Sequence, residues 1–140
     1  MAEDIFCRII KGEIPANKIY EDDDVLAILD ISQTTAGHSL VIPKAHYESL
    51  LSCPKETLDK VMLVAQRIGQ AEVAVLGAKG INYLINCGEA AGQTVPHFHI
   101  HVIPRYLGGE GGFRLEMKGQ DTSKMNLPIL AKQISDEIKN

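Results

Sequence analysis

Apolar residues and histidines alternate over residues 97–102 of this chain. Because successive side chains of a β-strand point to opposite faces, His97, His99 and His101 are predicted to project from one face of a strand over residues 95–103. A strand that only packs needs no stripe of a single polar residue type, so this pattern indicates a functional row. The apolar positions between the histidines, which we expect to face the core, are Phe98, Ile100 and Val102.

Other apolar segments predict the remaining elements. Short apolar runs bounded by turn residues are typical of strands, and helical spacing of apolar residues is typical of helices. The predicted strands cover residues 18–21, 25–30, 39–43 and 81–86. The predicted helices cover residues 5–11, 54–76 and 128–139. The last helix places Leu130, Ala131, Ile134 and Ile138 on one face.

The order of these elements predicts the fold class. Strands that follow each other through short turns, with one long helix between two groups of strands, favour an antiparallel α+β fold over parallel winding. We expect a sheet of about five strands with a short N-terminal helix, one long helix and a C-terminal helix. No linker or repeat divides the sequence, so residues 1–140 are expected to form a single domain.

Composition and charge exclude several classes of function. The 140 residues are 45% hydrophobic and 23% charged, as in ordinary soluble proteins. There is no apolar run of the roughly 20 residues that a membrane helix needs, and residues 1–4 are acidic where a signal peptide is basic. A net charge of −4 argues against nucleic acid as a partner. The three cysteines, Cys7, Cys53 and Cys87, suit a reducing compartment, so we expect a cytoplasmic protein with no membrane partner.

A glycine-rich loop over residues 88–92 leads into the histidine row. Glycines let backbone N–H groups approach a ligand closely, and a phosphate is the usual ligand of such a loop. Crowded imidazoles disfavour each other's protonation, so at least one ring is expected to be neutral near pH 7 and able to attack phosphorus. The rival reading is a metal ion held by histidines, since His-x-His on a strand is also good zinc geometry.

The residues around the row resemble a known signature. The pattern Asn86-x-Gly88-x-x-Ala91-Gly92-Gln93-x-Val95-x-His97-x-His99-x-His101 resembles that of the histidine-triad (HIT) superfamily of nucleotide hydrolases and transferases. Segments 5–16, 20–22, 29–31 and 37–46 resemble the Hint-like branch, which includes bacterial HIT-family proteins. The resemblance covers about residues 4–105 and implies a single HIT domain, followed by a C-terminal extension over residues 106–140.

The resemblance also implies a role for each matching residue. His99 matches the family's nucleophile, which attacks the α-phosphorus and forms a covalent nucleotidyl-histidine intermediate. His97 and His101 match the flanking members that orient the row and contact phosphate, and His38 matches a fourth histidine. Asp30 matches the carboxylate that binds ribose hydroxyls. The positions that match the full set of substrate contacts are Phe6, Ile9, Ile14, Asp30, Ile31, Asn86, Gly92, Gln93, Thr94 and Val95.

By this resemblance, we expect a hydrolase that acts at the α-phosphate of purine nucleoside 5′-monophosphate derivatives, with phosphoramidates as the favoured substrates. The alternatives are a dinucleoside polyphosphate hydrolase and a nucleotide-binding regulatory protein with little catalysis. The expected partners are a purine nucleotide and a second copy of the chain, with the long helix contributing to the homodimer interface.

No cofactor is expected to be required for catalysis. Many bacterial members of the family that this chain resembles carry a Cys-x-x-Cys motif near the N-terminus. In those proteins, two histidines that match His46 and His97 complete a structural zinc site with the two cysteines. This chain keeps Cys7 but has Asp4 in place of the first cysteine. Aspartate can bind zinc, although thiolate is the stronger ligand in a structural site. The sequence therefore leaves a structural zinc open, and we assign no metal ligand from it.

Overall fold

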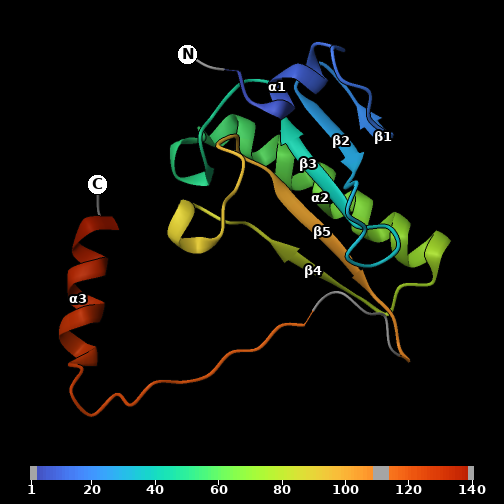
Figure 1. Ribbon diagram of the computed structural model, residues 1–140. Coiled ribbons are helices and arrows are strands. Elements are labelled where there is room, and N and C mark those ends of the chain that lie inside the picture. Colours follow the sequence, from blue (N-terminus) through green and yellow to red (C-terminus); the bar gives the residue numbers. More distant parts are fainter. Residues whose placement is uncertain (1–2, 109–113, 139–140) are drawn as a thin grey trace.

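The computed structural model describes residues 3–108 and 114–138. A sheet of five strands forms its centre, in the order β1-β2-β3-β5-β4, and every neighbouring pair is antiparallel (Figure 1). This arrangement confirms the predicted α+β class and the number of strands. The strands are β1 (Lys18–Glu21), β2 (Val25–Leu29), β3 (Ser39–Pro43), β4 (Gly80–Leu84) and β5 (Ile100–Arg105).

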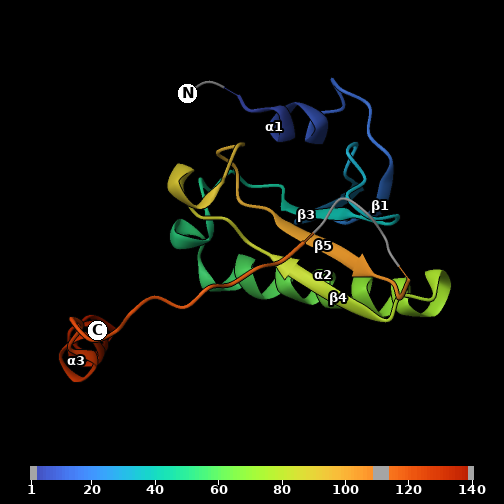
Figure 2. The same ribbon diagram turned by 60° about the horizontal axis from the view of Figure 1, so that its bottom comes forward.

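Three α-helices accompany the sheet. The short α1 (Ile5–Ile10) lies over one face and the long α2 (Lys55–Leu76) crosses the other, as Figure 2 shows. The third, α3 (Leu127–Ile138), lies apart from the sheet. Two short 3₁₀ turns, η1 (Leu50–Ser52) and η2 (Glu89–Ala91), precede α2 and β5. None of the helices in the described part of the chain is long and apolar enough to cross a membrane.

The two faces of the sheet bury separate apolar clusters. Side chains alternate along β2 and β3, so Val25, Ala27 and Val41 pack against α2. The alternate residues of the same strands pack with Phe6 and Ile9 of α1 on the other face. They are Leu26, Ile28, Leu40 and Ile42. The central strands are therefore buried on both sides.

The histidine strand is shorter than the sequence predicts. β5 begins at Ile100 rather than at residue 95, because the preceding segment turns away from the sheet. There the backbone N–H of His97 donates to the carbonyl of Val95, and that of Phe98 donates to the carbonyl of Tyr47. The alternation survives the turn, since Phe98, Ile100 and Val102 all lie in the cluster under α2.

The C-terminal helix forms where the sequence predicts it, within one residue at each end. The other described residues do not cover it, however. All of residues 114–138 are exposed, and α3 stands away from the sheet at the end of an extended segment (Figures 1 and 2).

Candidate active site

His99 lies immediately before β5, on the sheet face that α1 covers. Its Nδ1 is 2.7 Å from the backbone oxygen of His97. A carbonyl oxygen only accepts hydrogen bonds, so Nδ1 carries the ring proton and Nε2 keeps its lone pair. Phe6 holds the ring edge-on, with 5.0 Å between the ring centroids. The tautomer that this geometry selects is the one that a nucleophilic imidazole requires.

A second pair of imidazoles lies beside this ring. The Nε2 of His38 is 2.9 Å from the Nδ1 of His101. The backbone N–H of Thr34 donates to the Nδ1 of His38 at 3.3 Å, so His38 carries its proton on Nε2 and donates it to His101. His101 then carries its own proton on Nε2, as a donor on the side of the ring away from His38. The ring centroids of His101 and His99 are 5.0 Å apart.

Burial keeps these rings uncharged. Desolvation lowers the pKa of His99 below its usual value, and it lowers the pKa of His38 in the same way. The pKa of His101 falls to about 4, because burial is reinforced by charge repulsion from His99 and His38. The row therefore contains neutral imidazoles at pH 7, which is the state that crowding predicts from the sequence.

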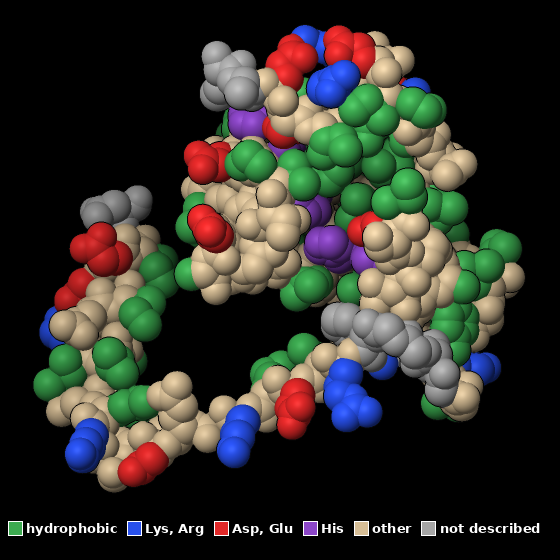
Figure 3. All heavy atoms as spheres, in the orientation of Figure 1, with side chains coloured by type: hydrophobic (Ala, Val, Ile, Leu, Met, Phe, Trp, Pro, Cys, Tyr) green, Lys and Arg blue, Asp and Glu red, His purple; other side chains and the backbone are tan. Residues whose placement is uncertain are grey.

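A pocket of about 320 Å³ opens beside His99 and His101, between α1 and the sheet. Its volume lies within the roughly 300–1,000 Å³ that is usual for small-molecule sites. Figure 3 shows imidazole side chains at the surface there, next to hydrophobic ones. Nine of the residues matched by resemblance line the pocket. They are Phe6, Ile9, Ile14, Asp30, Ile31, Thr94, Val95, His99 and His101.

Asp30 supplies the carboxylate of this largely apolar pocket. Its Oδ1 accepts from the backbone N–H of Ser32 at 2.8 Å, and its Oδ2 is 3.6 Å from the Nε2 of His38. A carboxylate oxygen has more than one lone pair, so Asp30 retains capacity to accept hydrogen bonds from a ligand. An apolar slot with one carboxylate suits a flat base joined to a hydroxylated sugar.

Further residues line the pocket without having been singled out in the sequence. Most of them adjoin the predicted ones in the chain, where a match to one position could have suggested its neighbours. Leu40 lies in segment 37–46, for which the sequence suggested no pocket role at this position, and it reaches the pocket through the pairing of β3 with β2 and β5. These additional lining residues are Ile5, Pro15, Ala16, Asn17, Ile28, Leu29 and Leu40.

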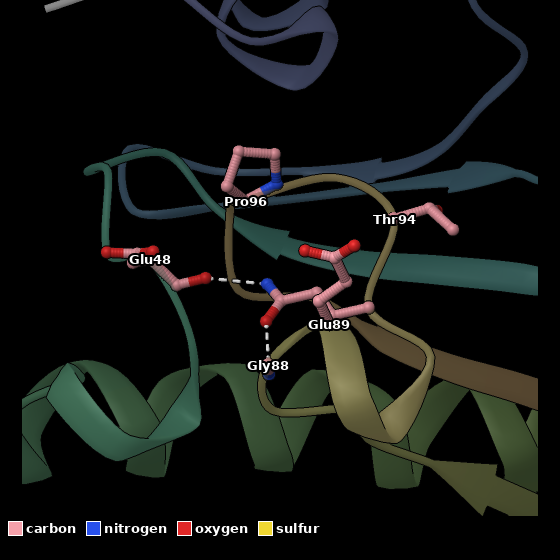
Figure 4. A pocket seen from close by; sticks show the side chains of 6 residues that line it. Glu48, Gly88, Glu89, Thr94 and Pro96 are labelled. Atoms are coloured by element: carbon pink, nitrogen blue, oxygen red, sulfur yellow. Dashed lines mark hydrogen bonds between the residues drawn. The ribbon is translucent and has the colours of Figure 1, made fainter.

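Gln93 holds the glycine loop in place and does not line this pocket. Its Nε2 donates to the backbone oxygens of Glu48 at 2.6 Å and Val95 at 3.0 Å. Its Oε1 accepts from the backbone N–H of Gly88 at 2.8 Å, and Figure 4 shows the bonds to Glu48 and Gly88. The whole amide is therefore occupied by backbone groups. It supports Thr94, which lies between this pocket and a second cavity.

That second cavity, of about 460 Å³, lies on the other side of the glycine loop (Figure 4). It shares Thr94 with the first pocket, so the two hollows adjoin at this residue. Its lining residues are Glu48, Gly88, Glu89, Gln93, Thr94 and Pro96.

Asn86 and Gly92 lie next to each other at the base of the loop. Gly92 has a φ of +96°, which glycine adopts far more readily than residues with a side chain. A Cβ at this position would be 3.8 Å from the Nδ2 of Asn86. The two residues thus form one corner of the loop, outside the pocket that contains His99.

His97 points away from the pocket. Its side chain is fully buried, and its Nε2 donates to the backbone oxygen of Pro43 at 2.8 Å. Its Nδ1 faces Asp4 and His46, at 3.1 Å from Oδ2 and 3.3 Å from Nδ1 respectively. The resemblance implies a phosphate contact for this residue, but the buried ring has no access to the pocket. Its contribution to the site is the backbone oxygen that orients His99.

Asp4, Cys7, His46 and His97 bring four donor atoms to one point. Cys7 Sγ is 3.5 Å from the Nδ1 of His97 and 3.7 Å from that of His46. Asp4 Oδ2 is 3.0 Å from the Nδ1 of His46 and 3.4 Å from the sulfur. Tetrahedral zinc, with bonds of about 2.0–2.3 Å, separates its ligand atoms by roughly 3.3–3.6 Å. The donor set therefore fits zinc, including Asp4 in place of a cysteine.

The fold and the row define a class of protein that presents a neutral, oriented imidazole to a ligand bound against an antiparallel sheet. The profile of the HIT domain family matches residues 11–108. The chain therefore belongs to the HIT family, a superfamily of nucleotide-binding proteins and hydrolases.

Individual relatives agree with this assignment. A crystal structure of a HIT family member from Bacillus subtilis is 40% identical and superposes with a TM-score of 0.91 over 99% of both chains. The adenylylsulfatase HINT3 of Arabidopsis thaliana is 46% identical over 101 residues, which are 72% of this chain and 51% of HINT3. A zinc-bound histidine triad family protein from Mycobacterium smegmatis is 43% identical, with a TM-score of 0.74 over 94% of this chain and 96% of that one.

Proposed function

We propose that this protein hydrolyses purine nucleoside 5′-monophosphate derivatives at the α-phosphate, with His99 as the nucleophile. The observation that carries the proposal is the 2.7 Å bond from the Nδ1 of His99 to the backbone oxygen of His97, which leaves Nε2 unprotonated beside the pocket. The relative HINT3 is an adenylylsulfatase, so one similar protein acts at such a phosphate. We favour phosphoramidates, in which the α-phosphorus is bonded to an amine nitrogen.

The reaction proceeds in two displacements. In the first, Nε2 of His99 forms a bond to phosphorus, and the bond to the leaving nitrogen breaks with its electron pair. That nitrogen takes up a proton from water. In the second, a water oxygen attacks phosphorus, the electron pair of the P–N bond returns to Nε2, and one proton is released to solvent. The product is a nucleoside 5′-monophosphate.

The remaining residues of the site have supporting roles in this proposal. The Nε2–H of His101 donates to a phosphate oxygen, which stabilises the charge that develops there. His38 keeps His101 in the required tautomer. Asp30 accepts hydrogen bonds from the ribose hydroxyls, and the apolar slot under α1 holds the base.

The test is turnover of an adenosine phosphoramidate by wild type and by His99→Ala. We expect release of AMP by the wild type, and a loss of at least about a thousandfold in kcat for the variant. AMP binding should change little, because most of the pocket is unaltered, and this binding serves as the control for folding. Rapid acid quench of the wild type should trap a nucleotidyl group on the peptide that contains His99. Full activity of His99→Ala would rule out this mechanism.

The same experiment separates the alternatives. A higher kcat/KM for a diadenosine polyphosphate than for the phosphoramidate would identify a dinucleoside polyphosphate hydrolase. Tight AMP binding with no turnover of either substrate would identify a nucleotide-binding regulatory protein.

We also propose that Asp4, Cys7, His46 and His97 hold a structural zinc ion. All six distances between their donor atoms lie near those of a tetrahedral site, and His97 donates through Nε2, so its Nδ1 offers a lone pair to a cation. Zinc there would neutralise the converging lone pairs and join α1 to the segments before α2 and β5. Elemental analysis of the purified protein should find one zinc per chain, and absence of zinc after purification in zinc-containing buffer would contradict the proposal.

A further inference from the structure

Glu72 is a buried carboxyl group for which the proposed reaction has no use. Its side chain lies on the buried face of α2 and is 7% exposed. A carboxyl group in such a place costs free energy unless it is protonated or hydrogen-bonded. Burial raises the pKa of Glu72 from its usual 4.5 to about 7, so this group gains or loses its proton close to neutral pH. What such a proton can control depends on the groups around it.

The neighbours of Glu72 lie on either side of His38 in the chain. Its Oε2 is 3.3 Å from the hydroxyl of Ser39, the first residue of β3. The same oxygen lies against Gly37, where an added Cβ would be 3.0 Å from it. The Ser39 hydroxyl also donates to the backbone oxygen of Gly37 at 2.7 Å. The carboxyl group therefore contacts the residues immediately before and after His38.

The side chain of His38 points to the opposite face of the sheet from Glu72. Ser39 points toward α2, and successive side chains of an extended chain alternate, so His38 points toward the face that α1 covers. There its Nε2 is 2.9 Å from the Nδ1 of His101, which lines the pocket. The backbone over residues 37–39 thus connects a titratable group on one face with the imidazole pair on the other.

The hydroxyl of Ser39 has one proton, and the charge on Glu72 decides which oxygen receives it. When Glu72 is protonated, its own O–H can donate to the Ser39 oxygen, while the hydroxyl donates to the Gly37 oxygen. When Glu72 is ionised, its proton has passed to solvent, and the buried carboxylate needs a donor. The Ser39 hydroxyl is at hand at 3.3 Å. Turning toward the carboxylate takes this donor away from the Gly37 oxygen.

We propose that Glu72 is a positioning residue for the pair of His38 and His101, and that its protonation state sets the orientation of the Gly37–His38 peptide group through the Ser39 hydroxyl. With the hydroxyl bonded to Gly37, the peptide group holds the His38 ring where its Nε2 donates to His101. With Glu72 ionised, this restraint is lost, and the N–H of His101 is aimed less well at the phosphate. Turnover in the proposed function, on which this kinetic consequence rests, should therefore decline as pH rises through about 7.

The other groups that pack around Glu72 do not titrate in this range. From β4, Tyr83 faces it, and the pKa of this phenol is raised by its own burial and by Glu72. From β5, Pro104 packs against Gly37 beside the carboxyl group, and β2 contains only apolar residues. Burial lowers the pKa of both rings of the imidazole pair, so an inflection near pH 7 does not come from either ring.

The kinetic test is kcat for the adenosine phosphoramidate from about pH 5.5 to about pH 9. We expect kcat of wild type to fall by about three- to tenfold across neutral pH. Glu72→Gln cannot ionise, and its amide can donate to Ser39, so this fall should be absent. Ser39→Ala removes the hydroxyl while Glu72 still titrates, so kcat should be low throughout and show no step. Glu56→Gln, exposed in the first turn of α2, is the matched control and should keep the wild-type profile.

A measurement without substrate distinguishes failure of this proposal from failure of the proposed function. In protein with isotope-labelled histidine, the NMR shifts of the His101 ring should inflect near neutral pH in wild type and Glu56→Gln, but not in Glu72→Gln or Ser39→Ala. This result in a protein without turnover would refute the hydrolysis and still support the positioning role. A wild-type pH profile in Glu72→Gln would overturn the proposal. So would a step of wild-type size in Ser39→Ala, because the charge would then act through space rather than through the hydroxyl.

Discussion

At the scale of single residues, Glu72 is the polar exception on the buried face of α2. It is 7% exposed, and its Oε1 has no hydrogen-bond partner among the described residues. Its Oε2 is 3.3 Å from the hydroxyl of Ser39, which already donates its proton to the backbone oxygen of Gly37 at 2.7 Å. The contact is then a hydrogen bond only if the carboxyl group is protonated. Burial correspondingly raises the pKa of Glu72 to about 7.

Protonation of Glu72 predicts a pH dependence of stability. The unfolded chain releases this proton near its ordinary pKa of 4.5, whereas the folded chain keeps it up to about 7. Between pH 4.5 and 7 the folded state therefore binds more protons than the unfolded state. The contribution of Glu72 to the free energy of unfolding consequently falls as pH rises from 4.5 to 7. The other titratable group facing the carboxyl is Tyr83, whose pKa is raised by its own burial and by Glu72, so it stays neutral throughout.

Glu72→Gln should remove this dependence. Urea unfolding should find the variant about 1–3 kcal/mol more stable than wild type at pH 8, and close to wild type at pH 5. Glu56→Gln, at an exposed position in the first turn of the same helix, is the matched control and should leave the pH profile unchanged. Equal stability of Glu72→Gln and wild type at both pH values would mean that Glu72 is ionised in the folded protein.

At the scale of elements, the glycine loop between β4 and β5 is held by one side chain. The three hydrogen bonds of the Gln93 amide connect the loop to itself and to the turn at Glu48. The loop positions Thr94 and Val95 against the pocket. Substrate binding should thus depend on Gln93 even though its amide has no free donor for a ligand.

Gln93→Leu should lower kcat/KM for the phosphoramidate by about 10–100-fold, because misplacement of a contact by about an ångström has effects of this size. The melting temperature should change by only a few degrees, since the loop lies outside both apolar clusters. Gln70→Leu, at an exposed position on α2, is the control. Wild-type kcat/KM in Gln93→Leu would show that the loop keeps its shape without this amide.

At the scale of the whole molecule, the proposed zinc site joins segments that are distant in the sequence. Asp4 and Cys7 belong to the start of α1, His46 follows β3, and His97 precedes β5. A chelator should therefore lower the melting temperature of the wild type by about 5–10 °C, as loss of a ligand that binds only the folded state destabilises it.

Two substitutions at Asp4 sharpen this prediction. Asp4→Ser keeps an oxygen that can cap α1 but removes the carboxylate ligand, so zinc content should fall. Asp4→Cys supplies a thiolate, so zinc should resist a higher chelator concentration than in wild type. Asp23→Ser, at an exposed aspartate, should behave as wild type. Identical zinc content in all four proteins would show that Asp4 is not a ligand.

Much of this molecule follows from its sequence. Periodicity of apolar residues determines the helices and strands, because each element must bury one face, and the alternation over residues 97–102 determines that Phe98, Ile100 and Val102 face the core. Resemblance to the HIT signature predicted nine of the residues that line the pocket. These features are local, or are repeated in relatives, so they can be read without coordinates.

The tertiary structure decided what depends on contacts between distant segments. The alternating pattern by itself gives the three histidines equal standing, and the resemblance to the HIT signature singles out His99 as the nucleophile. The fold encloses His97 among Asp4, Cys7 and His46, while it leaves His99 and His101 beside the pocket. Likewise, the sequence predicts an apolar face on α3, but only the position of the helix shows that residues 3–108 leave this face uncovered. The reason is physical: a side-chain pattern fixes which face of an element is buried, whereas the chain's path in space fixes what buries it.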